Sequence, residues 1–304
     1  MLSRTIILRL ADRPRIRNWF SRSRLTQSLI RRFIAGEDVS EAIAVAQDLE
    51  ANGFEVSLDH LGENVRDAAE ARRALEDYIH LVDEIGRAGI DSTISIKLTQ
   101  LGLDVDQALC QDQLLGLIEA ATERNIFVWI DMESSDYTDR TLDLFESAYA
   151  QSRQVGTVLQ TYLYRTSEDL DRLLGLGARI RLVKGAYLEP ATVAYRRKSE
   201  VDENYVALMH RLIEQGNLPA LATHDPKLIA SAKAQLEALK RDKRSIEFQM
   251  LYGISRETQT KLVSEGYRTL IYVPYGDQWY PYFVRRLAER PANLYFVLKN
   301  LLRR

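Results

Sequence analysis

The sequence predicts an α/β fold, a (β/α)8 barrel of the TIM type, and three observations point to it. Short apolar runs alternate eight times with amphipathic helical segments along the 304 residues, which is typical of a parallel sheet closed into a barrel. Each run ends in a cluster of polar or glycine residues. No GxGxxG follows the first run, which counts against a doubly wound sheet, the alternative fold.

The eight predicted strands are short apolar runs bounded by polar clusters. They lie at 55–58, 93–96, 126–130, 157–159, 180–183, 219–222, 246–248 and 270–273. Because active sites of this fold form at the carboxyl ends of the strands, the polar residues at those ends are expected to converge on one face. These residues are Asp59, Lys97, Asp131, Gln160, Lys184, His224, Gln249 and Tyr272.

The helices are predicted from apolar residues at helical spacing, with glycine near most of their carboxyl ends. One helix, 39–52, precedes the first strand and stops at Gly53. Seven more lie between the strands, at 63–89, 106–124, 138–152, 167–176, 190–215, 226–240 and 255–265. After the last strand and a Pro-Tyr-Gly turn, an aromatic-rich helix is predicted.

Residues 1–38 predict a basic amphipathic helical arm in front of a catalytic barrel at 39–304. The first 34 residues hold nine arginines against one acid, Asp12, with apolar residues interleaved. Such a helix suits peripheral contact with an anionic membrane surface. Docking onto the barrel, with the arginine face in solvent, is the alternative.

Composition argues against several classes of protein. A net charge of -2 does not fit a general nucleic-acid binder. The single cysteine, Cys110, excludes an internal disulfide framework and fits a reducing, cytoplasmic compartment. The four histidines have no metal-ligand spacing, so no metal site is predicted. No apolar run approaches the roughly 20 residues that span a bilayer.

The last predicted helix carries an arginine doublet that can bind a carboxylate. Arg285 and Glu289 fall on one face of the helix, and Arg286 lies about 100° round from Arg285. Two adjacent guanidiniums repel unless an anion sits between them. A solvated basic face is the alternative, but the neighbouring rings favour a partner for the charges. These rings belong to Tyr272, Tyr275, Trp279, Tyr280 and Tyr282.

Two further charged features fall at the predicted strand ends. Lys97 and Asp131 end neighbouring strands, so we expect them to meet as a partly buried ion pair. In the fifth strand, we expect one of Arg179 and Arg181 to point into the barrel and the other outward. An inward arginine needs an electron-rich partner. The Lys184-Gly-Ala segment that follows offers positive charge and backbone N–H groups.

The end of the sixth strand is predicted to open a helix. Thr223 and His224 precede Asp225 and Pro226, and a helix amino terminus can bind phosphate. Simple capping by Asp225 is the alternative, and both roles can hold together.

Six segments of the chain, in order, resemble the catalytic domain of bacterial monofunctional proline dehydrogenases. They are SIKLTQLG at 95–102, WIDME at 129–133, RLVKGAY at 181–187, ATH at 222–224, EFQ at 247–249 and YFVRRLAE at 282–289. The resemblance runs from about residue 39 to 301. It implies a distorted (β/α)8 barrel with the final helix over its mouth. Asp225 stands where some relatives have Asn, which leaves the cofactor contact there open.

The resemblance also implies the reaction. A flavin-dependent enzyme of this kind oxidises L-proline to Δ1-pyrroline-5-carboxylate by hydride transfer to flavin N5. The cofactor would be FAD, with FMN as the alternative, and electrons would pass to a membrane quinone. The enzyme would be cytoplasmic or peripheral at the inner face of the membrane.

The site residues follow from the positions of the matching motifs. The resemblance implies catalytic roles for Asp131 and Arg181. It implies substrate binding by Lys97, Asp131, Tyr272, Arg285, Arg286 and Glu289. It implies cofactor binding by Met132, Gln160, Arg181, Val183, Lys184, Gly185, Ala186, Thr223 and His224.

Two other functions are compatible with parts of the sequence. A cofactor-free lyase would use Lys97 or Lys184 as a Schiff-base nucleophile. A scaffold protein would bind acidic lipid or nucleic acid through the arginine-rich amino terminus.

Overall fold

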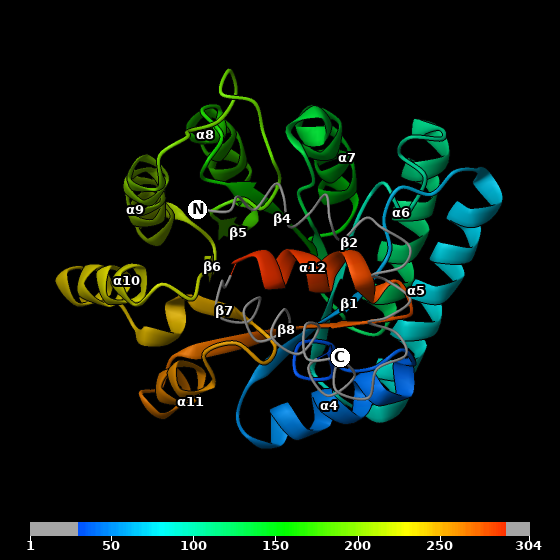
Figure 1. Ribbon diagram of the computed structural model, residues 1–304, viewed down its shortest axis with the longest axis horizontal. Coiled ribbons are helices and arrows are strands. Elements are labelled where there is room, and N and C mark those ends of the chain that lie inside the picture. Colours follow the sequence, from blue (N-terminus) through cyan, green and yellow to red (C-terminus); the bar gives the residue numbers. More distant parts are fainter. Residues whose placement is uncertain (1–29, 290–304) are drawn as a thin grey trace, which may run out of the picture.

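The computed structural model describes residues 30–289, which form a closed barrel of eight parallel strands in sequential order (Figure 1). The predicted barrel is therefore confirmed, and the doubly wound sheet is excluded. Every predicted run is a strand. The strands are β1 (Glu55–His60), β2 (Ser92–Ile96), β3 (Val128–Ile130), β4 (Val155–Gln160), β5 (Arg179–Val183), β6 (Ala220–Ala222), β7 (Glu247–Leu251) and β8 (Arg268–Tyr275).

Helices alternate with the strands, and all but the last of the described helices form a ring around the sheet. They are α4 (Val39–Ala51), α5 (Ala68–Ala88), α6 (Gln107–Glu123), α7 (Thr138–Gln151), α8 (Thr166–Leu176), α9 (Lys198–Gln215), α10 (Pro226–Ala238), α11 (Arg256–Ser264) and α12 (Trp279–Glu289), with short 3-10 turns η1 (Ser135–Tyr137) and η2 (Lys243–Ser245). Apolar side chains of this ring and of the strands are buried together in one continuous core.

Two helices begin later than the apolar pattern predicts, and capping explains both. The predicted helix 63–89 starts at Ala68, because the Asp67 carboxylate accepts the free N–H groups of Ala69 and Glu70. The predicted helix 190–215 starts at Lys198, where the Glu200 side chain binds the Arg197 N–H. The residues before each cap form loops at the barrel mouth.

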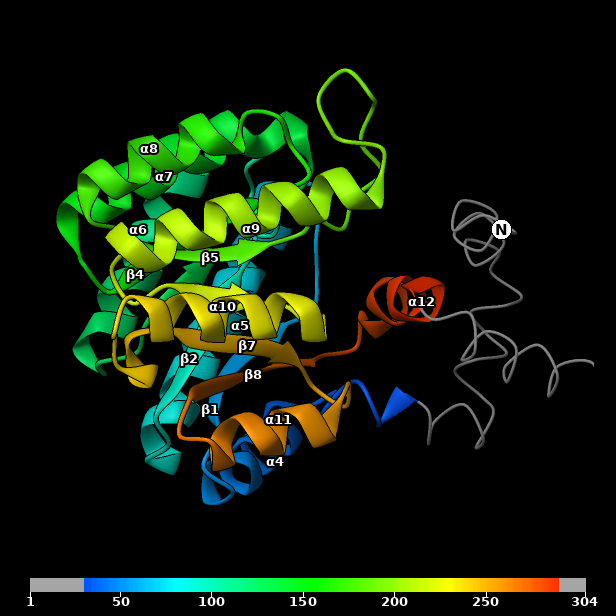
Figure 2. The same ribbon diagram turned by 90° about the vertical axis from the view of Figure 1, so that its left-hand side faces the viewer.

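The first and last described helices, α4 and α12, occupy different positions relative to the barrel. Figure 1 shows α4 in the helix ring between α11 and α5, where it packs on β1 and β8. Figure 2 shows α12 outside the ring, beyond the carboxyl ends of the strands. The helix that precedes β1 thus fills the place in the ring beside β8, and α12 is left to cover the mouth.

The chain that leads into α4 packs against α12. Ile30, Phe33 and Ile34 are buried together with Trp279 and Phe283, and the rings of Phe33 and Phe283 lie 6.4 Å apart. The rest of the predicted arm, residues 1–29, lies outside the described residues. No helix between residues 30 and 289 is long and apolar enough to cross a membrane.

The expectation that Arg179 and Arg181 point in opposite directions is wrong. Residues two apart on a strand share a face, and both guanidiniums lie inside the barrel against the ring of Trp129, at 5.1 and 4.5 Å. At the amino-terminal end, Arg179 donates to Glu247 at 2.8 Å and Arg268 to Glu55 at 2.7 Å. We call these four residues the lower ionic cluster.

Candidate active site

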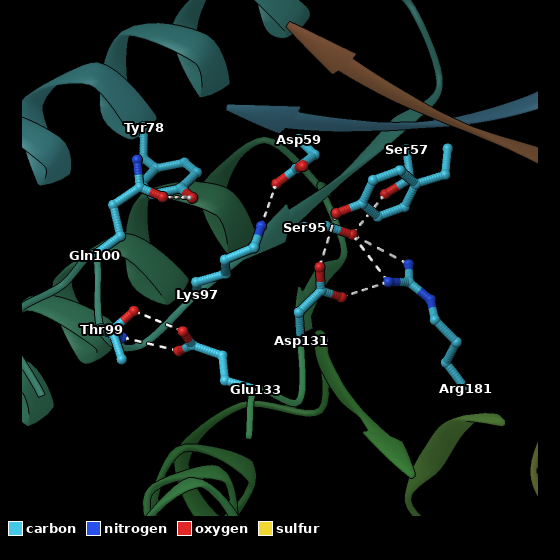
Figure 3. Close-up of polar contacts among 11 residues, drawn as sticks. Ser57, Asp59, Tyr78, Ser95, Lys97, Thr99, Gln100, Asp131, Glu133 and Arg181 are labelled. Atoms are coloured by element: carbon cyan, nitrogen blue, oxygen red, sulfur yellow. Dashed lines mark hydrogen bonds and ion pairs between the residues drawn. The ribbon is translucent and has the colours of Figure 1, made fainter. Parts of the chain in front are cut away.

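Four charged side chains meet near the barrel mouth, three from the carboxyl ends of β1, β2 and β3 and one from the middle of β5 (Figure 3). Lys97 Nζ lies 3.0 Å from Asp59 Oδ1, and Arg181 Nη1 lies 2.6 Å from Asp131 Oδ1. We call these four residues the upper ionic cluster. Their formal charges cancel, and all four are buried or nearly so.

The expected Lys97–Asp131 ion pair is not formed. Lys97 stands between the strands that carry Asp59 and Asp131, so either carboxylate is a neighbour. Arg181 reaches Asp131 from β5 and occupies it, which leaves Asp59 as the direct partner of Lys97. Asp131 still acts on Lys97 through its charge.

Arg181 is held from several sides. Its Nη1 and Nη2 groups both donate to Ser95 Oγ at 3.1 Å, and its guanidinium lies over the rings of Trp129 and Tyr272. A guanidinium has five N–H donors, and the contacts to Ser95 and Asp131 use three of them. Nε is buried without a hydrogen-bond partner among the described residues. The remaining donors suit an electron-rich ligand.

Electrostatics keep the lysine charged and Tyr272 protonated. Burial by itself lowers the pKa of Lys97, but Asp59 and Asp131 outweigh it and hold that pKa well above its ordinary value. Burial and the Asp131 charge raise the pKa of the Tyr272 hydroxyl, which donates to Asp131 Oδ2 at 2.8 Å. Burial raises the pKa of Asp131, although Arg181 and Lys97 act in the opposite direction.

α12 lies over the barrel mouth, beyond the strand ends that carry this site. Trp279, Tyr280 and Tyr282 are buried, as the ring-rich sequence predicted. Arg286 is half-buried, with its guanidinium 5.2 Å from the centre of the Tyr282 ring. The side chains of Arg285, the other member of the predicted doublet, and of the predicted acid Glu289 lie outside the described part of the structure.

Comparison with known proteins identifies the family. The family model for proline dehydrogenase matches residues 42–299. Proline dehydrogenase 2 of Bacillus subtilis strain 168 is 42% identical over 287 residues, covering 94% of this chain and 92% of that one. The chain belongs to the proline dehydrogenase family. It is therefore an oxidoreductase that acts on proline.

Other relatives agree. Proline dehydrogenase of Deinococcus radiodurans is 41% identical over an alignment of 310 positions, which covers 99% of this chain and 98% of that one. Among solved structures, proline utilization A from Bdellovibrio bacteriovorus, inactivated by N-propargylglycine, superposes with a TM-score of 0.81 at 28% identity. The match covers 87% of this chain and 33% of that larger chain.

The residues expected to contact a cofactor lie along the ends of β3 to β6. Gln160 donates through Nε2 to the Met132 carbonyl at 3.3 Å. Its buried Oε1 has no hydrogen-bond partner within residues 30–289. Gly185 has φ +110°, and a Cβ there would lie 2.3 Å from the Tyr162 ring, so only glycine fits at this bend. Val183 ends β5, and Ala186 follows Gly185.

Lys184 and the β6 end have protein partners of their own. Lys184 Nζ lies 2.6 Å from Asp202 and 3.0 Å from Asp225. Asp225 also accepts the Lys227 N–H, so the alternative of simple capping of α10 is confirmed. Thr223 Oγ1 accepts the Asp225 N–H, and His224 Nε2 accepts the Leu251 N–H at 3.1 Å. These bonds fix the backbone that would face a cofactor.

The residues that sequence reasoning missed are Ser57, Ser95 and the site role of Asp59. All three are at most 1% exposed and lie on the inward faces of β1 and β2. The missed signal is polar residues at every second position. β1 carries Glu55, Ser57 and Asp59, an alternation that an inward face of ordinary apolar packing does not show.

Proposed function

We propose that this chain oxidises L-proline to Δ1-pyrroline-5-carboxylate with a bound flavin as hydride acceptor. FAD is the proposed form, with a membrane quinone as the final electron acceptor. The observation that carries the proposal is the buried Arg181 guanidinium, which lies beside Asp131 with donors left for a ligand. Membership of the proline dehydrogenase family indicates that the substrate is proline.

The residues present fit a flavin. When bound, a flavin supplies the acceptor for the two electrons of the C–H bond that breaks. Its ring edge carries both hydrogen-bond acceptors and donors. Arg181 Nε and Gln160 Oε1 are buried polar atoms, and neither has a partner in the described part of the chain. One offers a donor and the other an acceptor, as such an edge requires.

The charge balance of the site indicates how proline would be held. Proline brings a carboxylate into a cluster whose own two cations are already paired with Asp59 and Asp131. Once the proline amine has lost its proton, another cation must balance this carboxylate. We propose that Arg285 and Arg286 on α12 bind this carboxylate, with Lys97 and Glu289 completing the binding site. A carboxylate fixed at one end orients the ring for reaction at C5.

The ring of Tyr272 and the carboxylates of Asp131 and Glu289 complete the proposed substrate pocket. Tyr272 contacts Arg181 and Asp131, so a substrate against its ring lies beside the upper ionic cluster. Hydride leaves C5 most readily when the ring nitrogen is neutral. We propose that Lys97, Asp131 and Glu289 set the local charge that favours loss of the amine proton. Arg181 and Lys184 would stabilise negative charge developing on the acceptor.

The visible spectrum of the purified protein tests this proposal. We expect a yellow protein whose absorbance bleaches on anaerobic addition of L-proline, while D-proline leaves it unchanged. A quinone should then restore the colour. A colourless protein that borohydride links covalently to substrate would contradict the proposal and favour a Schiff-base lyase.

A pair of arginine variants tests the carboxylate contact. Arg286→Met is expected to raise the proline KM by roughly tenfold or more, the loss of one charge-assisted hydrogen bond. Arg256→Met is the matched control, since Arg256 also lies over a tyrosine ring, that of Tyr252, but on exposed α11. Equal KM values in both variants would show that Arg286 does not bind the substrate.

The arginine-rich segment before the barrel completes the proposal. We propose that it makes the peripheral contact with an anionic membrane where the quinone resides. Removal of residues 1–29 should weaken sedimentation with anionic vesicles and leave proline-dependent bleaching intact. Unchanged sedimentation would place the membrane contact elsewhere.

A further inference from the structure

We propose that Ser95 and Ser57 are positioning residues, which fix the orientation of Arg181 through a hydroxyl chain of one defined direction. The inference rests on the proposed function, because Arg181 is the residue expected to face the cofactor. It adds two neutral side chains, from β1 and β2, to a site otherwise described by its charges and rings.

The first link is a fork between one hydroxyl and one guanidinium. Ser95 Oγ accepts from Arg181 Nη1 and from Nη2, both at 3.1 Å, and Ser95 is fully buried. Figure 3 shows the two contacts converging on the serine from β5, across the barrel. A single acceptor placed between both terminal nitrogens restrains rotation of the planar group more than one bond does.

The second link has a fixed direction. A hydroxyl has one hydrogen and two acceptor lone pairs. Arg181 uses both lone pairs of Ser95, so the Ser95 hydrogen is left for its one remaining polar contact within residues 30–289, Ser57 Oγ at 3.0 Å. Ser57 therefore accepts. The direction matters, since a serine that donates to Ser57 presents its electron-rich side to the arginine.

The hydroxyl chain and the carboxylate restrain different motions of Arg181. Asp131 neutralises the guanidinium but contacts only Nη1. Ser95 also holds Nη2, so it prevents rotation about the Nη1 contact. Without Ser95 the charge stays paired, but the direction of the Nε–H bond is lost. Ser95 thus orients a donor, and Asp131 balances its charge.

The flavin-loaded enzyme with Ser95→Ala, Ser57→Ala and Ser92→Ala tests the inference. Ser92 is the matched control, because it is a buried serine on β2 whose hydroxyl donates to the Val56 carbonyl, away from Arg181. Each variant is measured for kcat and KM with proline, for the midpoint potential of the flavin, and for its unfolding temperature.

Ser95→Ala is expected to lower kcat roughly tenfold with little change in KM, the effect of one hydrogen bond to a charged group. The same variant is expected to favour the reduced flavin tenfold less, which corresponds to a midpoint potential about 30 mV more negative for a two-electron couple. Ser57→Ala should lower kcat and the flavin potential by smaller amounts, and Ser92→Ala should change neither.

The outcomes separate this inference from the proposed function. A wild-type protein without flavin or proline-dependent bleaching would end the proposed function itself. A competent wild type with Ser95→Ala equal to Ser92→Ala in kcat and potential would overturn the positioning role alone. If Ser95→Ala does not fold, Ser57→Ala tests the inference in its place. That variant keeps both hydrogen bonds between Ser95 and Arg181 and removes only the acceptor of the Ser95 hydrogen.

Discussion

The barrel contains two ionic clusters of equal formal charge at its opposite ends, and strands β1 and β5 contribute to both. The lower ionic cluster has two arginines and two glutamates, and the upper one has Arg181 and Lys97 with two aspartates. On β5, Arg179 belongs to one cluster and Arg181 to the other. The ring of Trp129 contacts both guanidiniums.

The difference between the clusters lies in their carboxylates. In the lower cluster, Glu247 is fully buried and both oxygens are bound, Oε2 by Arg179 and Oε1 by the Gln249 amide. In the upper cluster, Asp59 Oδ2 is buried and has no partner in the described range. Arginine Nε atoms without a partner occur in both clusters, at Arg179 and Arg268 as well as at Arg181. The carboxylate oxygen of Asp59 is therefore what sets the upper cluster apart, because an open acceptor has capacity for a ligand. Charge at a strand end is therefore a weak sign of function, and a buried carboxylate oxygen without a partner is a stronger one.

The largest expected effect is on stability at the lower end. Arg179→Met leaves Glu247 buried without its main cation and should lower the unfolding free energy by about 3 to 5 kcal/mol. Urea unfolding measures this loss. Arg172→Met is the control, because Arg172 also contacts two acids, Asp143 and Glu146, but at the surface, where such pairs contribute about 0 to 1 kcal/mol. Similar losses in the two variants would contradict the distinction between clusters.

The next effect concerns activity at the upper end. Arg181→Met should lower kcat roughly 100-fold or more, the usual loss when a donor aimed at developing charge is removed. Its stability loss should be smaller than that of Arg179→Met, because Asp131 keeps the Tyr272 hydroxyl and a side chain 16% exposed to water. Steady-state kinetics with urea unfolding compare the two. If the same variant had the larger loss in both kcat and unfolding free energy, the two clusters would share one role.

The eight strands were predictable because each apolar run ends where polar residues begin, and that boundary is local. The starts of α5 and α9 were not, because Asp67 and Glu200 act as caps only once the backbone has turned. The placement of α12 over the mouth came from family resemblance and not from apolar periodicity. A helix packs as readily in the ring as across it.

The charged residues of the site were predictable, but their pairing was not. Strand order makes Lys97 a neighbour of both Asp59 and Asp131. The choice between them depends on Arg181, which reaches Asp131 from two strands further along the barrel. The inward position of Arg179 follows from strand alternation alone, so that error was avoidable.

A moderate effect is expected when one hydrogen bond of the upper cluster is removed and its charges are kept. Tyr272→Phe retains the ring over Arg181 but loses the 2.8 Å bond to Asp131, so kcat/KM should fall about tenfold. Tyr205→Phe removes another buried tyrosine hydroxyl, which donates to the Leu182 carbonyl, and should leave kcat/KM unchanged. An equal loss in both would point to a general packing effect.

The smallest effect is a pH dependence that only the upper end should show. The lower ionic cluster holds only guanidiniums and carboxylates, whereas His60 follows Asp59 and stacks on Tyr275 with ring centres 5.1 Å apart. Burial lowers the pKa of His60, helped by Lys97 and opposed by Asp77, Asp59 and Asp277. As pH falls through about 6.5, the unfolded chain therefore takes up this proton before the folded protein does.

Stability should accordingly decrease between pH 7 and pH 5, with a share from His60 of at most about 1.4 kcal/mol per pH unit. His60→Phe keeps an aromatic ring on Tyr275 and removes that share, so its unfolding free energy should fall less steeply with acid. Urea unfolding at a series of pH values compares the slopes. Parallel slopes would mean that His60 gains its proton equally in the folded and unfolded states, and that the two ends of the barrel do not differ in their response to acid.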